Sequence, residues 1–242
     1  MGKAGPGYQD GDVPGEPTML LVHSPLLTSA TWDALRPHLE AAGWRVAVPD
    51  LRPLVEAPSF HAAVCAAAAA SVAPGAPTVV VGHSRAGAYL PGIADALGND
   101  PLDVVFLDAR LPHPGNSWVG SAPPARAAWL REIAVSGRLP TWDTWFPAES
   151  LDDLVPEPGQ RLQVLRGLPE LPWTVVSEVL PAPGRSWNSA RHAYLRLSAA
   201  YESTAEEAEA AGYLVLRRYA DHLAMVTQPA MVADLLLSAL RA

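Results

Sequence analysis

Short apolar runs and helix-forming stretches alternate along most of the chain. The apolar runs are five to seven residues long and cover 19–23, 45–50, 78–84, 103–109, 192–198 and 213–219. Helical spacing or helix-favouring composition marks 31–44, 60–73, 85–98, 204–212 and 229–241, with a bend expected at Pro91. Strands that alternate with helices in this way predict an α/β fold. We therefore expect a mostly parallel six-stranded sheet flanked by helices.

The alternation stops between residues 114 and 190, which are rich in proline and tryptophan and contain no clear strand pattern. A structureless loop of this length is rare inside a compact domain, so we expect several short helices that form a cap. The cap would be inserted after the strand that ends at Asp108. The predicted core is then 18–113 together with 191–242, and the Gly- and Pro-rich residues 1–17 are expected to be a flexible lead-in. Six of the eight tryptophans lie in the cap: Trp118, Trp129, Trp142, Trp145, Trp173 and Trp187.

Composition narrows the possible functions. The chain has 242 residues, of which 49% are hydrophobic and 17% charged, as in a globular domain. The net charge is -8 and the basic residues are scattered, so we expect no nucleic-acid partner. A single cysteine, Cys65, excludes an intramolecular disulfide and is expected to be a small buried thiol. The absence of a long apolar run or signal-like N-terminus predicts no membrane span and a cytoplasmic location.

A serine stands at the predicted corner between a strand and a helix, in the stretch "VVVGHSRAGAYLP". Ser84 is surrounded by Gly82, Ala86 and Gly87, and only such small residues fit the crowded positions around a sharp strand-to-helix turn. The turn would raise the hydroxyl above the carboxyl edge of a parallel sheet, where ligands bind. The following helix would point its unpaired N–H groups at the same place. Ser84 is therefore a candidate nucleophile.

A serine nucleophile needs a base, and the base needs an acid that orients it. His222 follows the last predicted strand and precedes the final helix, where its imidazole could reach Ser84. Two acids satisfy the chain order serine, acid, histidine: Asp108, at the end of the strand beside the serine strand, and Glu202, shortly after the strand 192–198. We favour Asp108 and keep Glu202 as the alternative.

The tryptophan-rich cap predicts an apolar pocket for an aromatic or apolar small molecule. Trp142, Trp145 and Phe146 are the rings expected to face it. We expect the Arg85 side chain to pair with a nearby Asp or Glu rather than with a substrate carboxylate. The chain has no dinucleotide fingerprint or phosphate loop and no spaced set of metal ligands, so no cofactor and no metal are expected.

Several segments together resemble the α/β-hydrolase superfamily: "GHSRAG", "LVHSPLLTSATW", "VPDL", "VFLDA" and "ADHLAMVTQPAMVADLL". Over residues 18–242 the chain is most similar to the small, capped branch that contains esterases and hydroxynitrile lyases. The resemblance implies a hydrolase with Ser84 as the nucleophile and His222 as the base. It implies Glu202 as the acid where the acid follows the strand 192–198, and Asp108 where it follows the preceding strand.

The loop after the first strand departs from the pattern of the superfamily, which typically reads His-Gly-x and uses the backbone N–H of x to bind the oxyanion. Here Ser24 stands at the glycine and Pro25, which has no N–H, stands at x. The backbone N–H of Arg85 would remain, and Leu26 or the Ser24 hydroxyl could supply the second donor.

Three functions follow from this loop and this site. Hydrolysis of an ester, thioester or lactone is favoured. Non-hydrolytic acid–base chemistry by Ser84 and His222, as in a C–C lyase, cyclase or decarboxylase, is the alternative that the missing donor suggests. A ligand receptor without turnover is the alternative outside enzymes, because the same fold also serves as one.

Overall fold

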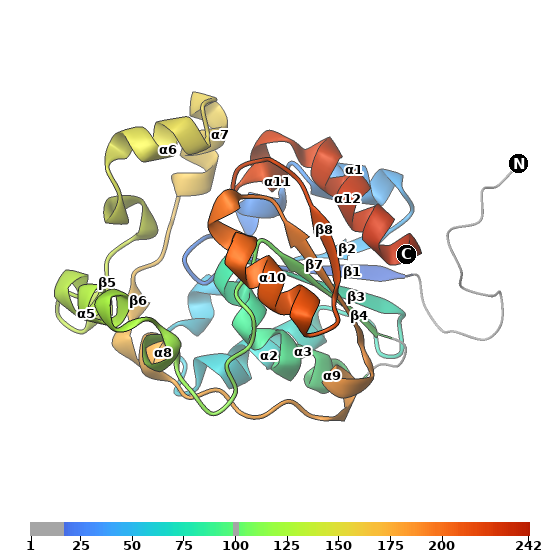
Figure 1. Ribbon diagram of the computed structural model, residues 1–242, viewed down its shortest axis with the longest axis horizontal. Helices are drawn as coiled ribbons and strands as arrows, with labels where there is room; N and C mark the ends of the chain where they lie inside the picture. The colour runs from blue at the N-terminus through green and yellow to red at the C-terminus, as the bar shows by residue number, and fades with distance from the viewer. Residues whose placement is uncertain (1–16, 99–101) are drawn as a thin grey trace, which may run out of the picture.

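The computed structural model describes residues 17–98 and 102–242; the predicted lead-in lies, except for residue 17, outside them. Six strands form one sheet in the order β2-β1-β3-β4-β7-β8, and every neighbouring pair is parallel. The predicted α/β fold with a six-stranded sheet is thereby confirmed (Figure 1). The strands are β1 (Thr18–Val22), β2 (Arg45–Ala47), β3 (Thr78–His83), β4 (Leu102–Leu107), β7 (Arg191–Arg196) and β8 (Leu214–Arg217).

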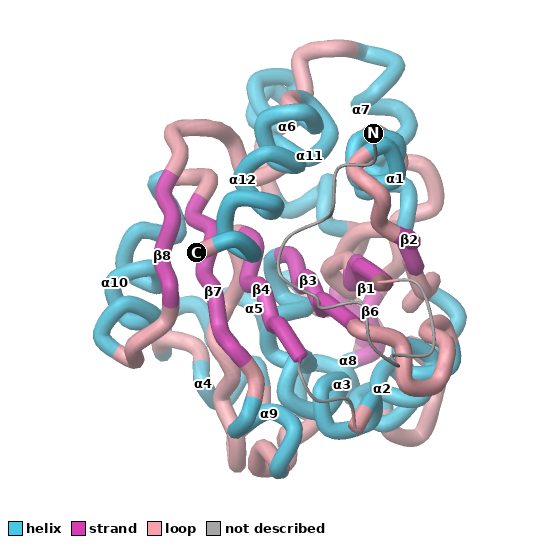
Figure 2. The backbone as a smooth tube through the Cα atoms, turned by 90° about the vertical axis from the view of Figure 1, so that its right-hand side faces the viewer, coloured by secondary structure: helices cyan, strands magenta, loops and turns pink. Residues whose placement is uncertain are grey.

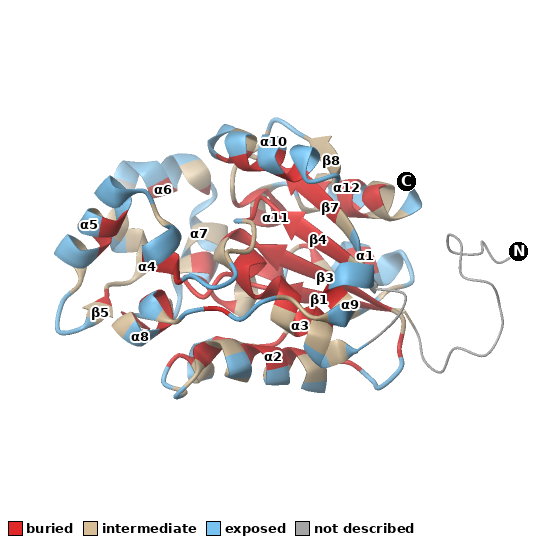
Figure 3. Cartoon of the chain, turned by 60° about the horizontal axis from the view of Figure 1, so that its bottom comes forward, coloured by how far each residue is buried: buried red, intermediate tan, exposed pale blue. Residues whose placement is uncertain are grey.

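Helices cover both faces of the sheet because the strand residues are apolar on both sides. In β1, Leu20 and Val22 join one buried cluster, while Met19 and Leu21 join the other. Figure 3 shows the resulting buried layer between the helices. The first face is covered by α2 (Phe60–Ala70), α3 (Leu90–Leu97) and α10 (Glu202–Ala210), and the second by α1 (Arg36–Ala41), α11 (Ala224–Thr227) and α12 (Pro229–Arg241). Among the described residues, no helix has the length and apolar character needed to cross a membrane.

Two predicted helices differ from the structure. The stretch 31–44 contains a 3₁₀ turn (Ser29–Trp32) followed by α1 instead of one continuous helix. The stretch 85–98 begins as the 3₁₀ helix η3 (Ser84–Tyr89) and becomes α-helical only at α3. Pro91 therefore lies in the first turn of α3, where it removes no intrahelical hydrogen bond, and the expected mid-helix bend is wrong.

The segment between β4 and β7 is mostly a set of short helices, and all of its labelled elements except α9 are seen at the left of Figure 1, beyond the ends of the strands. Its chain ends meet: the Gly115 N–H donates to the Leu180 carbonyl at 2.8 Å, and the Leu180 N–H donates to Asn116 at 3.0 Å. The elements are α4 (Trp118–Ser121), α5 (Pro124–Ile133), β5 (Arg138–Leu139), η4 (Trp142–Trp145), α6 (Ala148–Leu154), α7 (Pro158–Leu165), β6 (Leu171–Pro172), α8 (Trp173–Ser177) and α9 (Arg185–Ser189). We call residues 114–180 the cap; α9, which the predicted cap of 114–190 included, packs instead against α3 of the core (Figure 2).

Candidate active site

Ser84 stands directly after β3, on a tight turn into η3. Its φ is 57°, a left-handed value that non-glycine residues rarely adopt. The Ser84 carbonyl accepts a hydrogen bond from the Arg110 N–H at 2.9 Å, which ties the turn to the end of β4. Only 7% of the residue is exposed, and it lies on the wall of a cavity. This strained corner is the geometry that presents a nucleophilic hydroxyl.

The glycines around Ser84 are required by close packing. A Cβ on Gly87 would lie 2.1 Å from the Arg110 carbonyl oxygen, which is backbone and cannot move aside easily. A Cβ on Gly82 would lie 2.7 Å from a methyl group of Leu90. η3 at Gly87 thus lies so close to the segment after β4, and β3 at Gly82 so close to α3, that a side chain larger than hydrogen would clash at either position.

Asp108 holds the ring of His222. The residue follows β4, is fully buried and has a φ of 45°. Its Oδ2 accepts a hydrogen bond from His222 Nδ1 at 2.7 Å and one from the Ser198 hydroxyl at 2.6 Å. Its Oδ1 accepts from the N–H groups of Leu197 and Ser198, at 2.9 and 3.0 Å. With Nδ1 donating to the carboxylate, His222 Nε2 keeps its lone pair and can accept a proton.

Glu202, the alternative acid, points elsewhere. It forms ion pairs with Arg196 and Arg217, and the first of these guanidinium groups is itself buried. These two partners lower the pKa of the Glu202 carboxyl. The structure therefore brings Asp108, and not Glu202, to the imidazole of His222.

Two further rings contact His222. The Tyr201 ring stacks on the imidazole with a centroid separation of 4.9 Å and an angle of 7°. The buried His83 ring lies 4.5 Å away, and its Nε2 donates to the His222 carbonyl at 2.9 Å. Burial keeps the pKa of His83 well below its usual value, so this ring is neutral near pH 7. His222 is thus held by three neighbours. The Asp108 carboxylate and the Tyr201 ring contact its imidazole, and His83 binds its backbone carbonyl.

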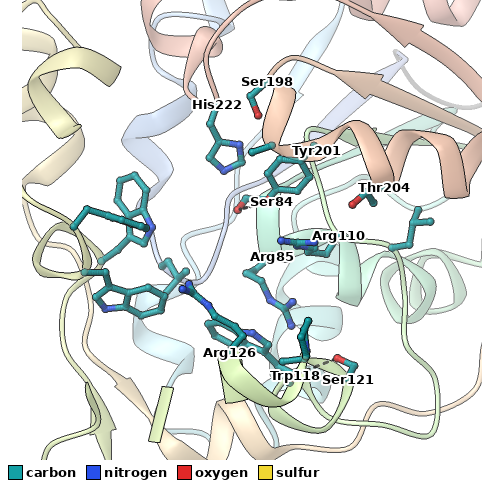
Figure 4. A pocket seen from close by; sticks show the side chains of 18 of the residues that line it. Ser84, Arg85, Arg110, Trp118, Ser121, Arg126, Ser198, Tyr201, Thr204 and His222 are labelled. Atoms are coloured by element: carbon teal, nitrogen blue, oxygen red, sulfur yellow. Dashed lines mark hydrogen bonds between the residues drawn. The ribbon is translucent and has the colours of Figure 1, made fainter. Parts of the chain in front are cut away.

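In this state the Ser84 hydroxyl is close to Tyr201. Its Oγ lies 3.5 Å from the Tyr201 hydroxyl, at the outer limit of a hydrogen bond. Among the hydrogen bonds of the described residues, none joins Ser84 to His222, although both side chains line the same cavity (Figure 4). Catalytic hydrogen bonds are often long or misaligned before substrate binds and tighten only in the complex with substrate.

The loop after β1 makes a tight turn in which the Leu27 N–H donates to the Ser24 carbonyl at 2.9 Å. Ser24 and Pro25 are buried, whereas Leu26 reaches the cavity wall beside Ser84 and Arg85. The Leu26 N–H donates to the Ser24 hydroxyl oxygen at 3.3 Å, a long bond. Of the predicted oxyanion donors, Leu26 and Arg85 therefore lie at the cavity, and the Ser24 hydroxyl serves as an acceptor inside the loop.

The cavity has a volume of about 820 Å³ and lies between the ends of the strands and the cap. Trp142, Trp145 and Phe146, the rings predicted to face a pocket, all line it, together with Trp118. Arg85 also lines it, but in the described part of the chain no carboxylate pairs with this arginine, contrary to expectation. The described residues contain no group of three or more His, Cys, Asp or Glu side chains that could hold a metal ion.

Comparison with solved structures identifies the fold. An extracellular α/β-hydrolase from a Paenibacillus species superposes with a TM-score of 0.70 at 19% identity, over 92% of this chain and 98% of that one. Tomato methylketone synthase I, solved with 2-tridecanone, has a TM-score of 0.67 at 16% identity, over 93% and 97%. A pyrethroid hydrolase from Sphingobium faniae has a TM-score of 0.61 at 20% identity, over 92% and 96%. The chain has the α/β-hydrolase fold. No protein-family profile and no curated protein matches its sequence.

Three residues that contact Ser84, Asp108 or His222 in this α/β-hydrolase fold were not singled out from the sequence as part of the site. His83 precedes the serine, and Ser198 and Tyr201 follow β7. A signal existed for two of them, because His83 and Ser198 stand at the carboxyl ends of predicted strands, at the edge where ligands bind. The position of Tyr201 depends on the 3₁₀ turn Ala199–Tyr201, which the sequence does not specify.

Proposed function

We propose that the protein hydrolyses carboxylic esters of aromatic or apolar small molecules through a Ser84–His222–Asp108 triad. The observation that carries the proposal is the hydrogen bond of 2.7 Å from His222 Nδ1 to the buried Asp108, in a cavity that Ser84 enters from a strained turn. Esterases and hydrolases of the same fold support the reaction type. The aromatic cap wall supports the substrate class.

In the proposed reaction, Ser84 Oγ adds to the carbonyl carbon of the ester while its proton passes to His222 Nε2. Asp108 stabilises the imidazolium that forms. The backbone N–H groups of Arg85 and Leu26 would stabilise the oxyanion. The alcohol then leaves with the proton from His222. A water molecule next adds to the acyl carbon while it gives a proton to the same nitrogen, and this proton passes to Ser84 Oγ as the bond from Oγ to the acyl carbon breaks and the carboxylic acid is released.

Labelling with a fluorophosphonate tests the nucleophile. We expect one adduct by intact-protein mass spectrometry, located on Ser84, and none in Ser84→Ala. Ser121→Ala is the matched control, because it removes another serine hydroxyl from the cavity wall while leaving the turn intact. In parallel, turnover of 4-nitrophenyl esters should be lost in Ser84→Ala and in His222→Ala. Labelling that persists in Ser84→Ala would contradict the assignment.

Three observations favour the non-hydrolytic alternative. Pro25 offers no N–H, the Leu26 N–H is engaged with Ser24, and the hydroxyl of Ser84 approaches Tyr201 rather than His222. A site of this kind could use Ser84 and His222 for proton transfer without a covalent intermediate. The labelling experiment separates the two functions: a wild-type protein that resists the probe but catalyses His222-dependent proton transfer supports acid–base chemistry.

A further inference from the structure

Three arginines line the active-site cavity without a carboxylate partner. Arg85 follows the candidate nucleophile, Arg110 follows β4, and Arg126 projects from α5 of the cap. Among the described residues, none of the three has a carboxylate oxygen within 4.0 Å. In Figure 4 they lie on one side of the cavity, below Ser84.

Of the thirteen other arginines in the described chain, six form ion pairs with acids, and the seven that do not lie outside the cavity. Ion pairs link Arg52 to Asp50, and Arg191 to Asp103, at 2.7 and 2.6 Å. The same kind of contact holds Arg138, Arg161, Arg196 and Arg217. The distinguishing feature of Arg85, Arg110 and Arg126 is therefore that three unpaired arginines of the described chain line the same cavity.

Aromatic faces hold the cavity arginines in place. The guanidinium carbon of Arg85 lies 4.3 Å from the centre of the Trp118 ring, and one of its nitrogens lies 3.4 Å from His113 Nε2. Arg110 lies over the Tyr201 ring at 5.0 Å, and Arg126 lies over Trp129 at 3.9 Å. A guanidinium that stacks on a ring keeps its N–H edge free to bind an oxyanion.

The positive charges are not compensated locally. Burial and, to a smaller extent, the positive charges of Arg110 and Arg126 lower the pKa of Arg85 to about 10. Arg85 therefore stays protonated near pH 7. Glu207 is the one carboxylate among the described residues that line the cavity; it is exposed and pairs with none of them.

We propose that the substrate carries a free carboxylate on its aromatic or apolar body, which Arg85, Arg110 and Arg126 bind while the ester group lies at Ser84. The inference rests on the proposed function and adds a substrate class to it. A carboxylate fits because guanidinium groups bind its two oxygens in a planar, bidentate manner.

A matched pair of esters tests the inference: 4-nitrophenyl 4-carboxybenzoate and its neutral analogue, 4-nitrophenyl 4-carbamoylbenzoate. The kcat/KM of each ester is divided by the rate of alkaline hydrolysis of the same ester. The corrected ratio is this value for the anionic ester divided by this value for the neutral ester. We expect this corrected ratio to favour the anionic ester by about tenfold at low ionic strength and to fall as salt is added, because salt screens charges at partly exposed sites. A ratio of one or less overturns the proposal.

Variants identify the groups responsible. Arg110→Gln and Arg126→Gln should each lower the corrected ratio several-fold, whereas Arg131→Gln, which removes an exposed cation of the same cap helix outside the cavity, should not change it. A preference that survives both cavity substitutions overturns the assignment.

If wild-type protein hydrolyses neither ester, the proposed function fails, and binding then decides the inference. Calorimetry with 4-carbamoylbenzoate and with neutral terephthalamide should show tighter binding of the anion. Equal binding would overturn the inference as well.

Discussion

The two walls of the active-site cavity differ in how their groups are held. On the wall built from strand ends, Ser84, Asp108 and His222 are largely buried, and two of them have strained backbone angles that hydrogen bonds maintain. On the cap wall, Arg126 and Phe146 are exposed and are held mainly by contacts between rings and cations. In the proposed reaction the first wall fixes the geometry of the reacting atoms, and the second can vary in shape and charge without moving them.

Asp108→Asn changes the group on the strand-end wall that orients the His222 ring, and we expect it to have the largest effect. An amide can present its NH₂ group to His222 Nδ1, which favours the wrong tautomer, and kcat/KM for a 4-nitrophenyl ester should fall by about 10⁴-fold. Glu202→Gln is the matched control and should change the rate by less than about threefold. Circular dichroism and thermal unfolding establish that both variants are folded. Comparable rate losses in the two variants would contradict the assignment of Asp108.

Lowering the pH tests whether the stability of the core beneath this wall depends on histidines that are buried in their neutral form. His23 donates to the Ser24 carbonyl and accepts from the Leu51 N–H, and burial lowers its pKa from 6.5 to about 4. The unfolded state therefore binds more protons between these pH values. The free energy of unfolding should have its full value above pH 6.5. As the pH drops to 4, it should fall by about 3 kcal/mol from the protonation of His23 alone.

Urea unfolding at intervals from pH 7 to pH 4 measures this loss. His23→Gln should be less stable at pH 7 and should show a shallower pH dependence over the same window. His38→Gln, which removes an exposed imidazole, is the control and should keep the wild-type slope. An unchanged slope in His23→Gln would show that other groups cause the acid sensitivity.

Phe146→Ala probes the cap wall. The ring lines the cavity and packs edge-on against Trp142 at 5.8 Å, and 41% of the residue is exposed. Its loss removes apolar contact with the substrate, so KM for an aromatic ester should rise by about fivefold, the equivalent of about 1 kcal/mol. The kcat should change by less than about twofold. A large fall in kcat with constant KM would contradict the division between the two walls.

Tyr201→Phe should have the smallest effect. It removes a hydroxyl that lies 3.5 Å from Ser84 Oγ but keeps the ring that stacks on His222. Because a bond of this length is weak, kcat/KM should fall by less than about threefold. Tyr201→Ala, which also removes the stacked ring, should lose more activity. A loss of 100-fold in Tyr201→Phe would instead indicate that the hydroxyl takes part in proton transfer.

The sheet could be predicted from the sequence because each strand is short, apolar on both faces and followed by a helix. The six apolar runs overlap the six strands, and Leu20 and Leu21 contribute to opposite faces of the same sheet. Boundaries were less predictable where 3₁₀ turns replace α-helix, as at Ser84–Tyr89. The packing of Gly87 on the Arg110 carbonyl favours the tighter turn there, and no local pattern contains that long-range contact.

The site was harder to predict than the sheet. Ser84, His222 and Asp108 could be named because strand ends and chain order limit the candidates. The choice between Asp108 and Glu202 needed coordinates in three dimensions, since only the fold shows that Arg196 and Arg217 occupy the second carboxylate. The expected acid partner of Arg85 is missing because the cavity surrounds this residue with rings and other cations.

The paired backbone hydrogen bonds between Gly115, Asn116 and Leu180 close the base of the cap. The chain leaves the core and returns to it at this one pair of hydrogen-bonded segments, which we call the neck. The number of residues in the excursion between them, the cap, therefore does not affect the separation of β4 and β7. An excursion of different size or sequence could be joined at this neck, while the groups of the proposed triad keep their places on the core. The proposed substrate preference could thus vary with the cap, and the proposed chemistry would stay with the core.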